Sequence, residues 1–224
     1  MKPNKIVALI PMRHHSQRVP GKNYRMLDGK PLYQHILDTL EQVPEVNQIV
    51  VDTDSPEIIR GIHANYPKIT VIDRPRELRG DEVSMNEILM YDTSQVSADL
   101  YLQTHSTNPL LKAVTISRAI KTLSEGYPGY DSLFSVTRLQ TRLYDELGRA
   151  INHNPAMLIQ TQDLPPVYEE NSCIYLFTRE NLVERSHRIG ERPYLFEIDA
   201  DEAWDIDEEV DFKLVELLLK ARSI

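Results

Sequence analysis

Little in this chain marks a disulfide-rich, glycine-looped or membrane-spanning protein. A single cysteine, Cys173, excludes an intramolecular disulfide, and the eight glycines form neither a Walker loop nor a dinucleotide fingerprint. The seven histidines show no metal-ligand spacing. Behind the basic N-terminus, the apolar run 6–10 stops at Pro11, which is too short for a membrane span, and no small-residue cleavage site follows. We therefore expect a cytoplasmic protein that is neither exported nor membrane-bound.

Basic residues are outnumbered, with 25 Lys and Arg against 34 Asp and Glu and a formal net charge of −9. This balance argues against a nucleic-acid-binding protein, which needs a broad basic face. Positive charge is instead concentrated in residues 13–30, which hold five basic residues and one acidic residue, Asp28. A cationic loop that directly follows a strand-like apolar run predicts a binding site for a phosphate-bearing ligand.

Strand-like apolar runs alternate with helical patterns over the first part of the chain. Expected strands lie at 6–10, 48–52, 69–72, 99–103 and 132–136, and expected helices at 32–43, 55–66, 82–95 and 108–123. The alternation predicts βαβ units, and hence an α/β fold whose largely parallel sheet has helices on both faces. Ligands bind such sheets at the carboxyl ends of the strands. We therefore expect the loops after residues 10, 52, 72 and 103 to form one rim.

The pattern changes after Val136. Residues 137–170 are rich in Arg, Gln, Asn and Pro and have no strong helical period, so we expect an excursion of short strands and loops that forms an oligomer contact. Beyond it we expect strands at 172–177 and 194–198 and helices at 181–188 and 208–222. The apolar face of the last helix is predicted to consist of Val210, Leu214, Leu217, Leu218 and Ala221. The whole of 1–224 is predicted to be one domain with this one insertion.

The most acidic segment, 197–211, has nine carboxylates and no basic residue. Within it, Asp205 and Asp207 are separated by Ile206, so on an extended backbone their side chains point the same way. Two convergent carboxylates suit Mg²⁺, which takes its remaining ligands from water and substrate phosphates. Asp207 also stands where the final helix needs an N-cap. Together with the cationic loop, the pair predicts a site where metal and basic side chains neutralise a triphosphate.

Two further segments at predicted strand ends carry polar groups. Asp52 and Asp54 mimic the metal-binding aspartate pair of sugar-nucleotide glycosyltransferases, although Asp54 fits better in the turn that leads to an N-cap at Ser55. The loop from Gln103 to Asn108 offers amide and hydroxyl groups to a ligand. Asn108 is also expected to cap the helix that follows.

Seven short motifs follow one another along nearly the whole chain. They are Met12-Arg13 with Ser16, Arg18, Pro20 and Lys22-Asn23; Gly29-Lys-Pro31-Leu32; Thr53-Asp54; Arg74-Pro75 with Leu78, Asp81 and Ser84; His105-Ser-Thr-Asn-Pro-Leu110; Asn171-Ser-Cys-Ile-Tyr175; and Asp205-Ile-Asp207. In this order they resemble the acylneuraminate cytidylyltransferase (CMP-sialic acid synthetase) family, within the synthetases of CMP-activated 2-keto sugar acids. Each motif is weak alone, but seven in order are specific.

The resemblance implies a Rossmann-like three-layer sandwich with an inserted dimerisation element at 137–170. It also implies an Mg²⁺-dependent transfer of CMP from CTP to the anomeric hydroxyl of a 2-keto sugar acid, with release of pyrophosphate. The expected partners are CTP, the sugar acid and a second copy of the chain, with no nucleic acid or membrane. Positions that match the family's motifs take the family's roles. The implied catalytic residues are Arg13, Lys22, Asp205 and Asp207, of which the two aspartates hold Mg²⁺. The implied nucleotide-binding residues are Ser16, Arg18, Asn23, Arg74 and Ser84, and the implied sugar-binding residues are His105, Thr107, Asn108 and Asn171.

The chain departs from the family pattern mainly where the sugar should bind. His105 replaces a glutamine, Ser172 replaces a glycine, and Thr161 and Glu169 stand where sialic-acid enzymes tend to have arginines. In the first loop, Gln17 and Arg18 stand where Gly or Lys is common. We therefore expect CTP as the nucleotide and a sialic, pseudaminic or legionaminic type of acid as the sugar.

Two alternative functions remain open at this point. A glycosyltransferase that uses Asp52 and Asp54 requires both carboxylates to face an open cleft. A non-catalytic nucleotide-binding protein would keep the fold and bind CTP without turnover. The pair Asp205 and Asp207 argues against the non-catalytic protein, because a protein without activity would not need to retain a costly cluster of like charges.

Overall fold

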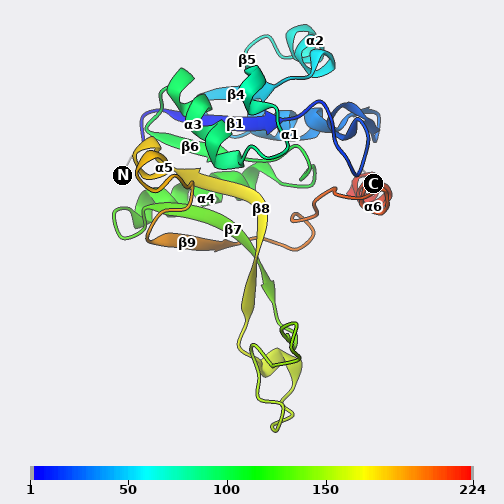
Figure 1. Cartoon of the computed structure of the whole chain (residues 1–224), viewed down its shortest axis with the longest axis vertical. Coiled ribbons are helices and arrows are strands. Elements are labelled where there is room, and N and C mark those ends of the chain that lie inside the picture. Colours follow the sequence, from blue (N-terminus) through cyan, green and yellow to red (C-terminus); the bar gives the residue numbers. More distant parts are fainter. Residues whose placement is uncertain (1–2, 223–224) are drawn as a thin grey trace.

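The computed structural model describes residues 3–222, and it has a seven-stranded sheet between two layers of helices (Figure 1). The strand order is β5-β4-β1-β6-β8-β7-β9. These strands are β1 (Ile6–Met12), β4 (Gln48–Thr53), β5 (Thr70–Asp73), β6 (Leu100–Gln103), β7 (Ser132–Leu139), β8 (Val167–Phe177) and β9 (Pro193–Glu197). All neighbours pair in parallel except β8, which is antiparallel to β6 and to β7. The predicted α/β class with a mostly parallel sheet is confirmed.

Helices cover both faces of the sheet. One face packs against α1 (Leu32–Glu41), α2 (Pro56–Asn65) and α4 (Ala113–Gly126), and the other against α3 (Met85–Gln95) and α5 (Arg179–Arg185). Side chains of β1 alternate between the two cores: Ala8 and Ile10 enter the first, and Val7 and Leu9 enter the second. Because both faces of the strand are buried, β1 reads as a continuous apolar run.

The carboxyl ends of the four parallel strands meet at one edge of the sheet, as predicted. Met12 pairs with Thr53, and Thr53 pairs with Asp73, so β1, β4 and β5 end side by side, and Gln103 ends β6 next to β1. The short elements η1 (Lys22–Tyr24), β2 (Met26–Leu27) and β3 (Lys30–Pro31) follow β1, and η2 (Arg76–Leu78) follows β5. This edge collects the loops that carry most of the predicted site residues.

Residues 137–170, here called the arm, leave the body of the molecule as a ribbon of two strands (Figure 1). β7 and β8 continue from the sheet into the arm, where Thr137 pairs with Glu169 and Leu139 with Val167. The tip beyond these strands contains the single turn η3 (Thr161–Asp163). The base of the arm therefore extends two strands of the main sheet, where only short strands were expected. Among residues 3–222, no helix is long and apolar enough to cross a membrane.

The prediction that Asn108 caps a helix is wrong. α4 begins at Ala113, and its N-terminus is capped from far along the chain by Glu202, whose Oε2 accepts from Lys112 N (2.9 Å) and whose Oε1 accepts from Thr115 Oγ1 (3.0 Å). Asn108 is instead buried, and its Nδ2 donates to Trp204 O (3.3 Å). Glu202 thus satisfies the N–H of the N-cap residue, and its negative charge is favourable at a helix N-terminus.

The predicted apolar face of the final helix, α6 (Glu209–Arg222), is wrong in most of its residues, although Leu218 does pack against the core. Phe212 and Val215 are the buried side chains, whereas Val210, Leu214 and Leu217 are exposed. The helix carries two apolar stripes, so periodicity could not choose between them. The choice is made by the loop after β1: its residues Val19 and Leu27 pack on the Phe212 side, and the Arg25 guanidinium lies 4.3 Å over the Phe212 ring.

Candidate active site

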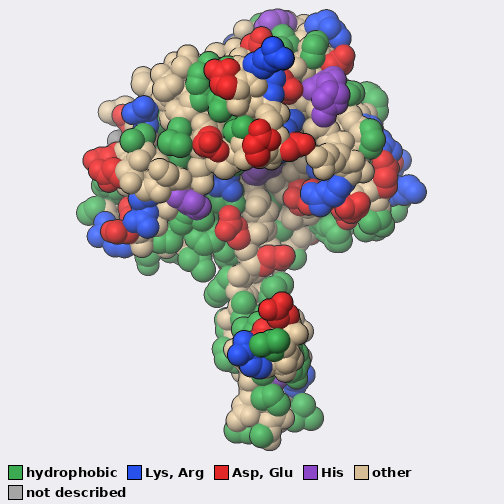
Figure 2. All heavy atoms as spheres, viewed as in Figure 1, with side chains coloured by type: hydrophobic (Ala, Val, Ile, Leu, Met, Phe, Trp, Pro, Cys, Tyr) green, Lys and Arg blue, Asp and Glu red, His purple; other side chains and the backbone are tan. Residues whose placement is uncertain are grey.

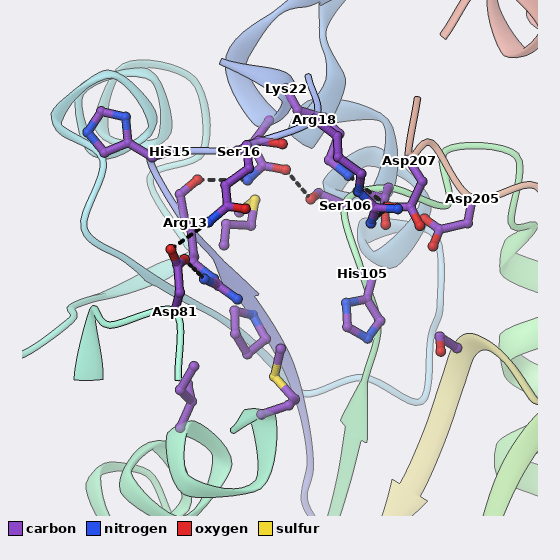
Figure 3. Close-up of a pocket in the computed structure, with 18 of the residues that line it drawn as sticks. Arg13, His15, Ser16, Arg18, Lys22, Asp81, His105, Ser106, Asp205 and Asp207 are labelled. Atoms are coloured by element: carbon purple, nitrogen blue, oxygen red, sulfur yellow. Dashed lines mark hydrogen bonds and ion pairs between the residues drawn. The ribbon is translucent and has the colours of Figure 1, made fainter. Parts of the chain in front are cut away.

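A cleft of about 860 Å³ opens at the edge where the parallel strands end (Figure 3). Its walls come from the loop after β1, the segments before and at the start of α3, the loop after β6, and the segment that precedes α6. The structure brings ten of the thirteen predicted site residues into its lining: Arg13, Ser16, Arg18, Lys22, Asn23, Arg74, His105, Thr107, Asp205 and Asp207.

The other three predicted residues lie beside the cleft and, within the described chain, are not part of its lining. Ser84 is the N-cap of α3: its Oγ accepts from Glu87 N (3.3 Å) and donates to Glu87 Oε2 (2.7 Å). Asn108 is buried behind the loop after β6. Asn171 joins the two strands of the arm base, accepting from Ser135 Oγ (2.6 Å) and donating to Thr137 Oγ1 (3.1 Å). All three side chains support the walls of the cleft.

A glycine and an asparagine shape the cationic loop. Gly21 has φ 67°, where a side chain is strained, and a Cβ there would meet the Tyr24 ring at 2.8 Å. The loop then turns into η1 and places Asn23 between two segments. Asn23 Nδ2 donates to Arg13 O (2.8 Å), and Asn23 Oδ1 accepts from Ser106 Oγ (2.7 Å). Asn23 therefore ties the loop after β1 to the loop after β6.

The three loop cations of the cleft each face a carboxylate (Figure 3). Arg13 Nη1 lies 2.5 Å from Asp81 Oδ1, whereas Arg18 Nη2 and Lys22 Nζ lie 2.7 and 3.3 Å from the same atom, Asp207 Oδ1. Lys22 Nζ also donates to Ile206 O (2.6 Å). Each cation therefore has an anionic partner in the cleft wall, and Arg and Lys side chains bind phosphate oxygens through the same kind of charged hydrogen bond.

The acidic pair faces the cleft because Ile206, between them, is fully buried and its N–H donates to Thr107 O (2.9 Å). Asp207 does not cap α6. That role belongs to Asp211, whose Oδ2 accepts from Asp207 N (3.1 Å) and Glu208 N (2.8 Å), so the Asp207 carboxylate stays available to the cleft.

Asp205 has an unusual environment. Burial raises the pKa of its carboxyl and the neighbouring Asp207 raises it further, while a hydrogen bond with Thr107 opposes the rise. Within residues 3–222, its Oδ1 is buried and has no hydrogen-bond partner. No group of three or more His, Cys, Asp or Glu side chains in this part of the chain could hold a metal ion. Two carboxylates alone leave most ligand positions of a cation such as Mg²⁺ to water or to other oxygen atoms.

His105 is held in one tautomer by its neighbours. Arg188 Nη1 donates to Gln103 Oε1 (2.6 Å), so Gln103 Nε2 faces Thr104 O (3.1 Å) and His105 Nε2 (2.9 Å). His105 Nε2 must then accept, which leaves the proton on Nδ1. Desolvation, with the charges of Arg188 and Lys22, lowers the pKa of His105 to about 3. His105 is thus a neutral hydrogen-bond donor. Neither Arg188 nor Gln103 carried a sequence signal for this role, because they lie 85 residues apart.

The aspartates of the glycosyltransferase alternative do not both face the cleft. Asp52 is 1% exposed, and its Oδ1 accepts from Arg74 Nε inside the protein. Asp54 Oδ1 accepts from His14 N (2.7 Å), and Ser55 caps α2 as predicted. The requirement for two carboxylates in an open cleft is not met, and that alternative is wrong. Cys173 is buried in the core.

A family model described as cytidylyltransferase matches residues 7–224. The chain belongs to the cytidylyltransferase family. This cytidylyltransferase is 25% identical to post-translational flagellin modification protein B of Campylobacter coli, over 99% of its own length and 97% of that protein. It is 28% identical to CMP-N,N'-diacetyllegionaminic acid synthase of Legionella pneumophila, over 96% and 97% of the two chains. It is 25% identical to N-acylneuraminate cytidylyltransferase A of Danio rerio over 96% of its length, and it spans 51% of that relative.

Solved structures show the same fold. A CMP:2-keto-3-deoxy-manno-octonic acid synthetase complexed with CTP superposes on the cytidylyltransferase with a TM-score of 0.73, at 18% identity, covering 98% of this chain and 100% of that one. A 4-diphosphocytidyl-2C-methyl-D-erythritol synthase gives a TM-score of 0.69 at 17% identity, covering 96% and 99%. The Rossmann-like architecture expected from the motifs is confirmed.

Proposed function

We propose that the protein transfers CMP from CTP to the anomeric hydroxyl of a 2-keto sugar acid of the sialic, pseudaminic or legionaminic type, with release of pyrophosphate. The observation that carries the proposal is the cleft itself, which is large enough for a nucleotide and whose lining brings the loop cations Arg18 and Lys22 into contact with the acidic pair at Asp207. The names of the Legionella and Danio relatives, a legionaminic acid synthase and an acylneuraminate transferase, support this class of sugar.

In this reaction the hydroxyl oxygen of the sugar attacks the α-phosphorus of CTP, and the bond from that phosphorus to pyrophosphate breaks. Catalysis needs positioning and neutralisation of charge, and no covalent nucleophile. Arg13, Arg18 and Lys22 line the cleft from one loop and are proposed to hold the phosphate oxygens. Asn23 fixes that loop against the loop after β6.

Asp205 and Asp207 are the residues proposed to hold Mg²⁺. The buried Asp205 Oδ1, which lacks a hydrogen-bond partner among the described residues, fits a cation ligand. An arriving cation would also offset the burial that raises the pKa of this carboxyl. When bound, the ion supplies additional positive charge to the phosphate oxygens.

The sugar is proposed to bind near His105 and Ser172, which both line the cleft. His105 offers a neutral N–H donor. Ser172 has φ 60°, a conformation in which a residue other than glycine is strained, and its Oγ is hydrogen-bonded to the Tyr175 hydroxyl oxygen (3.2 Å). Because strained residues are common at binding sites, this conformation at the cleft wall supports a role for the Ser172 hydroxyl in binding the sugar.

The activity is tested by incubating the protein with CTP, MgCl₂ and a panel of sialic, pseudaminic and legionaminic acids. We expect pyrophosphate release that requires one of the sugars and the metal, and a CMP-sugar product of the matching mass. UTP and ATP serve as matched nucleotide controls. CTP binding without pyrophosphate release for any sugar would instead support the non-catalytic alternative.

We also propose that the arm forms a homodimer contact. It exposes seven large apolar side chains: Tyr144, Leu147, Ile151, Met157, Leu158, Ile159 and Tyr168. Figure 2 shows apolar side chains along the arm, well away from the body. A two-stranded ribbon is marginally stable alone in water, and exposed apolar patches mark interaction sites. A second copy would cover this surface through a symmetric contact.

Replacing residues 140–166 with Asn-Gly should give a folded monomer. The paired residues Leu139 and Val167 would then be joined by a two-residue hairpin turn. We expect light scattering after gel filtration to report a dimer for the wild type and a monomer for the variant. The midpoint of thermal unfolding of the body, measured at low protein concentration, should change little. A variant that stays dimeric would place the interface elsewhere on the body.

A further inference from the structure

Three buried ionisable side chains meet next to the cleft. Asp52 on β4, Arg74 directly after β5 and Asp92 on α3 are each 1% exposed. Arg74 lines the cleft, and its backbone N–H donates to Thr53 O (3.1 Å). Neither aspartate belongs to the phosphate-facing part of the site. Buried charges are costly unless they are paired, so the group calls for a physical explanation.

Asp52 accepts hydrogen bonds from two of the three nitrogens of the Arg74 guanidinium. Arg74 Nε donates to Asp52 Oδ1, and Nη2 donates to Asp52 O (3.4 Å). Within residues 3–222, Arg74 Nη1 has no hydrogen-bond partner although it is buried. Two of the three guanidinium nitrogens are therefore fixed by one residue, and the third lacks a hydrogen-bond partner among the described residues.

Asp92 completes the group. Asp52 Oδ2 and both oxygens of Asp92 are buried and, in the described part of the chain, receive no hydrogen bond from any N–H or hydroxyl group. The two carboxyls lie close enough to hydrogen-bond each other. A proton on Asp92 lets it donate to Asp52, which gives a partner to one oxygen of each carboxyl.

The charges of the three side chains indicate that the proton lies on Asp92. Arg74 supplies one positive charge against two buried carboxyls, so ionising both carboxyls would leave an uncompensated buried negative charge. Burial, with the charge of Asp52, raises the pKa of Asp92 to about 9, although Arg74 opposes the rise. Asp54 adds a further negative charge near Asp52. At neutral pH the group therefore holds one cation, one anion and one neutral carboxyl.

The position of Arg74 in the cleft suggests what it meets. Met85 and Ile88 of α3 and Pro11 of β1 line the same cleft and are apolar. The loop cations and the acidic pair are proposed to bind the phosphates. The apolar wall can therefore contact the flat face of a base, and Arg74 can donate a hydrogen bond to an acceptor on its edge.

We propose that Asp92 is a positioning residue, which donates a hydrogen bond to Asp52 and so holds Asp52 in the orientation that directs Arg74 Nη1 to the base of the nucleotide. This inference rests on the proposed function, because it requires CTP in the cleft. Asp92 touches no substrate. It acts through Asp52, and its loss should weaken nucleotide binding more than it slows the chemical step.

Two substitutions of Asp92 separate the hydrogen bond from the space it fills. Asp92→Asn keeps the shape and supplies an amide donor, and we expect its KM for CTP to stay within about threefold of wild type. Asp92→Leu removes the donor, and we expect its KM for CTP to rise about tenfold or more while kcat changes less. Calorimetric binding of CTP without sugar should show the same order.

Thr93→Val is the matched control. Thr93 is also buried on α3, and its Oγ1 donates to Met90 O of the same helix (3.2 Å). A folded Thr93→Val protein should keep the wild-type KM for CTP. If folded Asp92→Leu binds CTP like wild type, or if Asp92→Asn is as damaging as Asp92→Leu, the inference is overturned. If the wild type itself neither binds nor turns over CTP, the proposed function fails instead.

Unfolding at several pH values tests the proton on Asp92 without any nucleotide. In the unfolded chain this carboxyl ionises near pH 4, whereas in the folded protein it keeps its proton up to about pH 9. Its contribution to stability is present below the unfolded pKa and is lost progressively as pH rises towards the folded pKa. Asp92→Asn lacks this loss, so its gain in unfolding midpoint over wild type should grow from pH 5 to pH 8. A gain that stays constant from pH 5 to pH 8 would show that folded Asp92 is already ionised, and it would overturn the inference.

Discussion

Replacing Asp207 with alanine is expected to lower kcat for CMP transfer by about 10³-fold or more while CTP still binds. Asp207 is one of the two proposed metal ligands, and its Oδ1 is the atom that Arg18 and Lys22 both contact. The substitution removes the carboxylate but leaves both cations for the phosphates. Pyrophosphate release gives kcat, and calorimetry gives the Kd for CTP.

Glu208→Gln is the matched control for this prediction. Glu208 is the next carboxylate along the chain, its side chain is 57% exposed, and it lies 3.8 Å from Arg18 Nη1. A pair this exposed contributes about 0–1 kcal/mol, so kcat should change by no more than about twofold. The Asp207 side chain is itself 40% exposed, and Asp207→Ala should therefore stay folded. An Asp207→Ala protein that turned over with unchanged metal dependence would contradict the metal assignment.

The parts of the fold that the sequence predicted are those decided by local pattern. Apolar runs bounded by turns predicted the strands β1, β4 and β6, which end at Met12, Thr53 and Gln103 in the structure. Ser55 and Pro56 predicted the start of α2. The parallel order then follows from alternation with helices, so the shared edge of the sheet could be predicted as well.

The errors arise where a distant segment decides the local structure. The start of α4 depends on Glu202, which lies about 90 residues from the helix it caps. The buried face of α6 depends on Val19 and Leu27, which choose one of two apolar stripes. No short stretch of sequence contains both partners, so helix propensity and apolar periodicity cannot predict the start of α4 or the buried face of α6.

The site shows the same division. The cationic loop and the acidic pair could be found from charge alone, because each is concentrated in one segment. Asp81 and Asp92 received no role from the sequence. Asp81 contacts Arg13 across 68 residues, and Asp92 lies within α3, far along the chain from Asp52. Only the packing of α3 on the sheet brings Asp92 to Asp52 and shows that it is buried.

Substituting Lys22 with methionine is expected to lower kcat/KM for CTP by about 10²–10³-fold, the loss typical of one preorganised charge donor. Lys22 is 9% exposed, and its donation to Ile206 O fixes the ammonium group at the acidic pair. Methionine keeps the length and the apolar stem and removes the charge. Steady-state pyrophosphate release over a range of CTP concentrations separates the effect on kcat from the effect on KM.

Arg25→Met is the control for Lys22→Met, since Arg25 belongs to the same loop and pairs with Glu209 (2.5 Å) outside the cleft lining. It should lose stability through its contact with Phe212 and keep its kcat/KM. The double variant Lys22→Met with Asp207→Ala is the sharper measurement. If both groups neutralise charge in the same step, their effects are not additive, and the double variant should be little worse than Asp207→Ala alone. Fully additive losses would mean that Lys22 and Asp207 act in separate steps, and the 3.3 Å contact between them would then have no catalytic meaning.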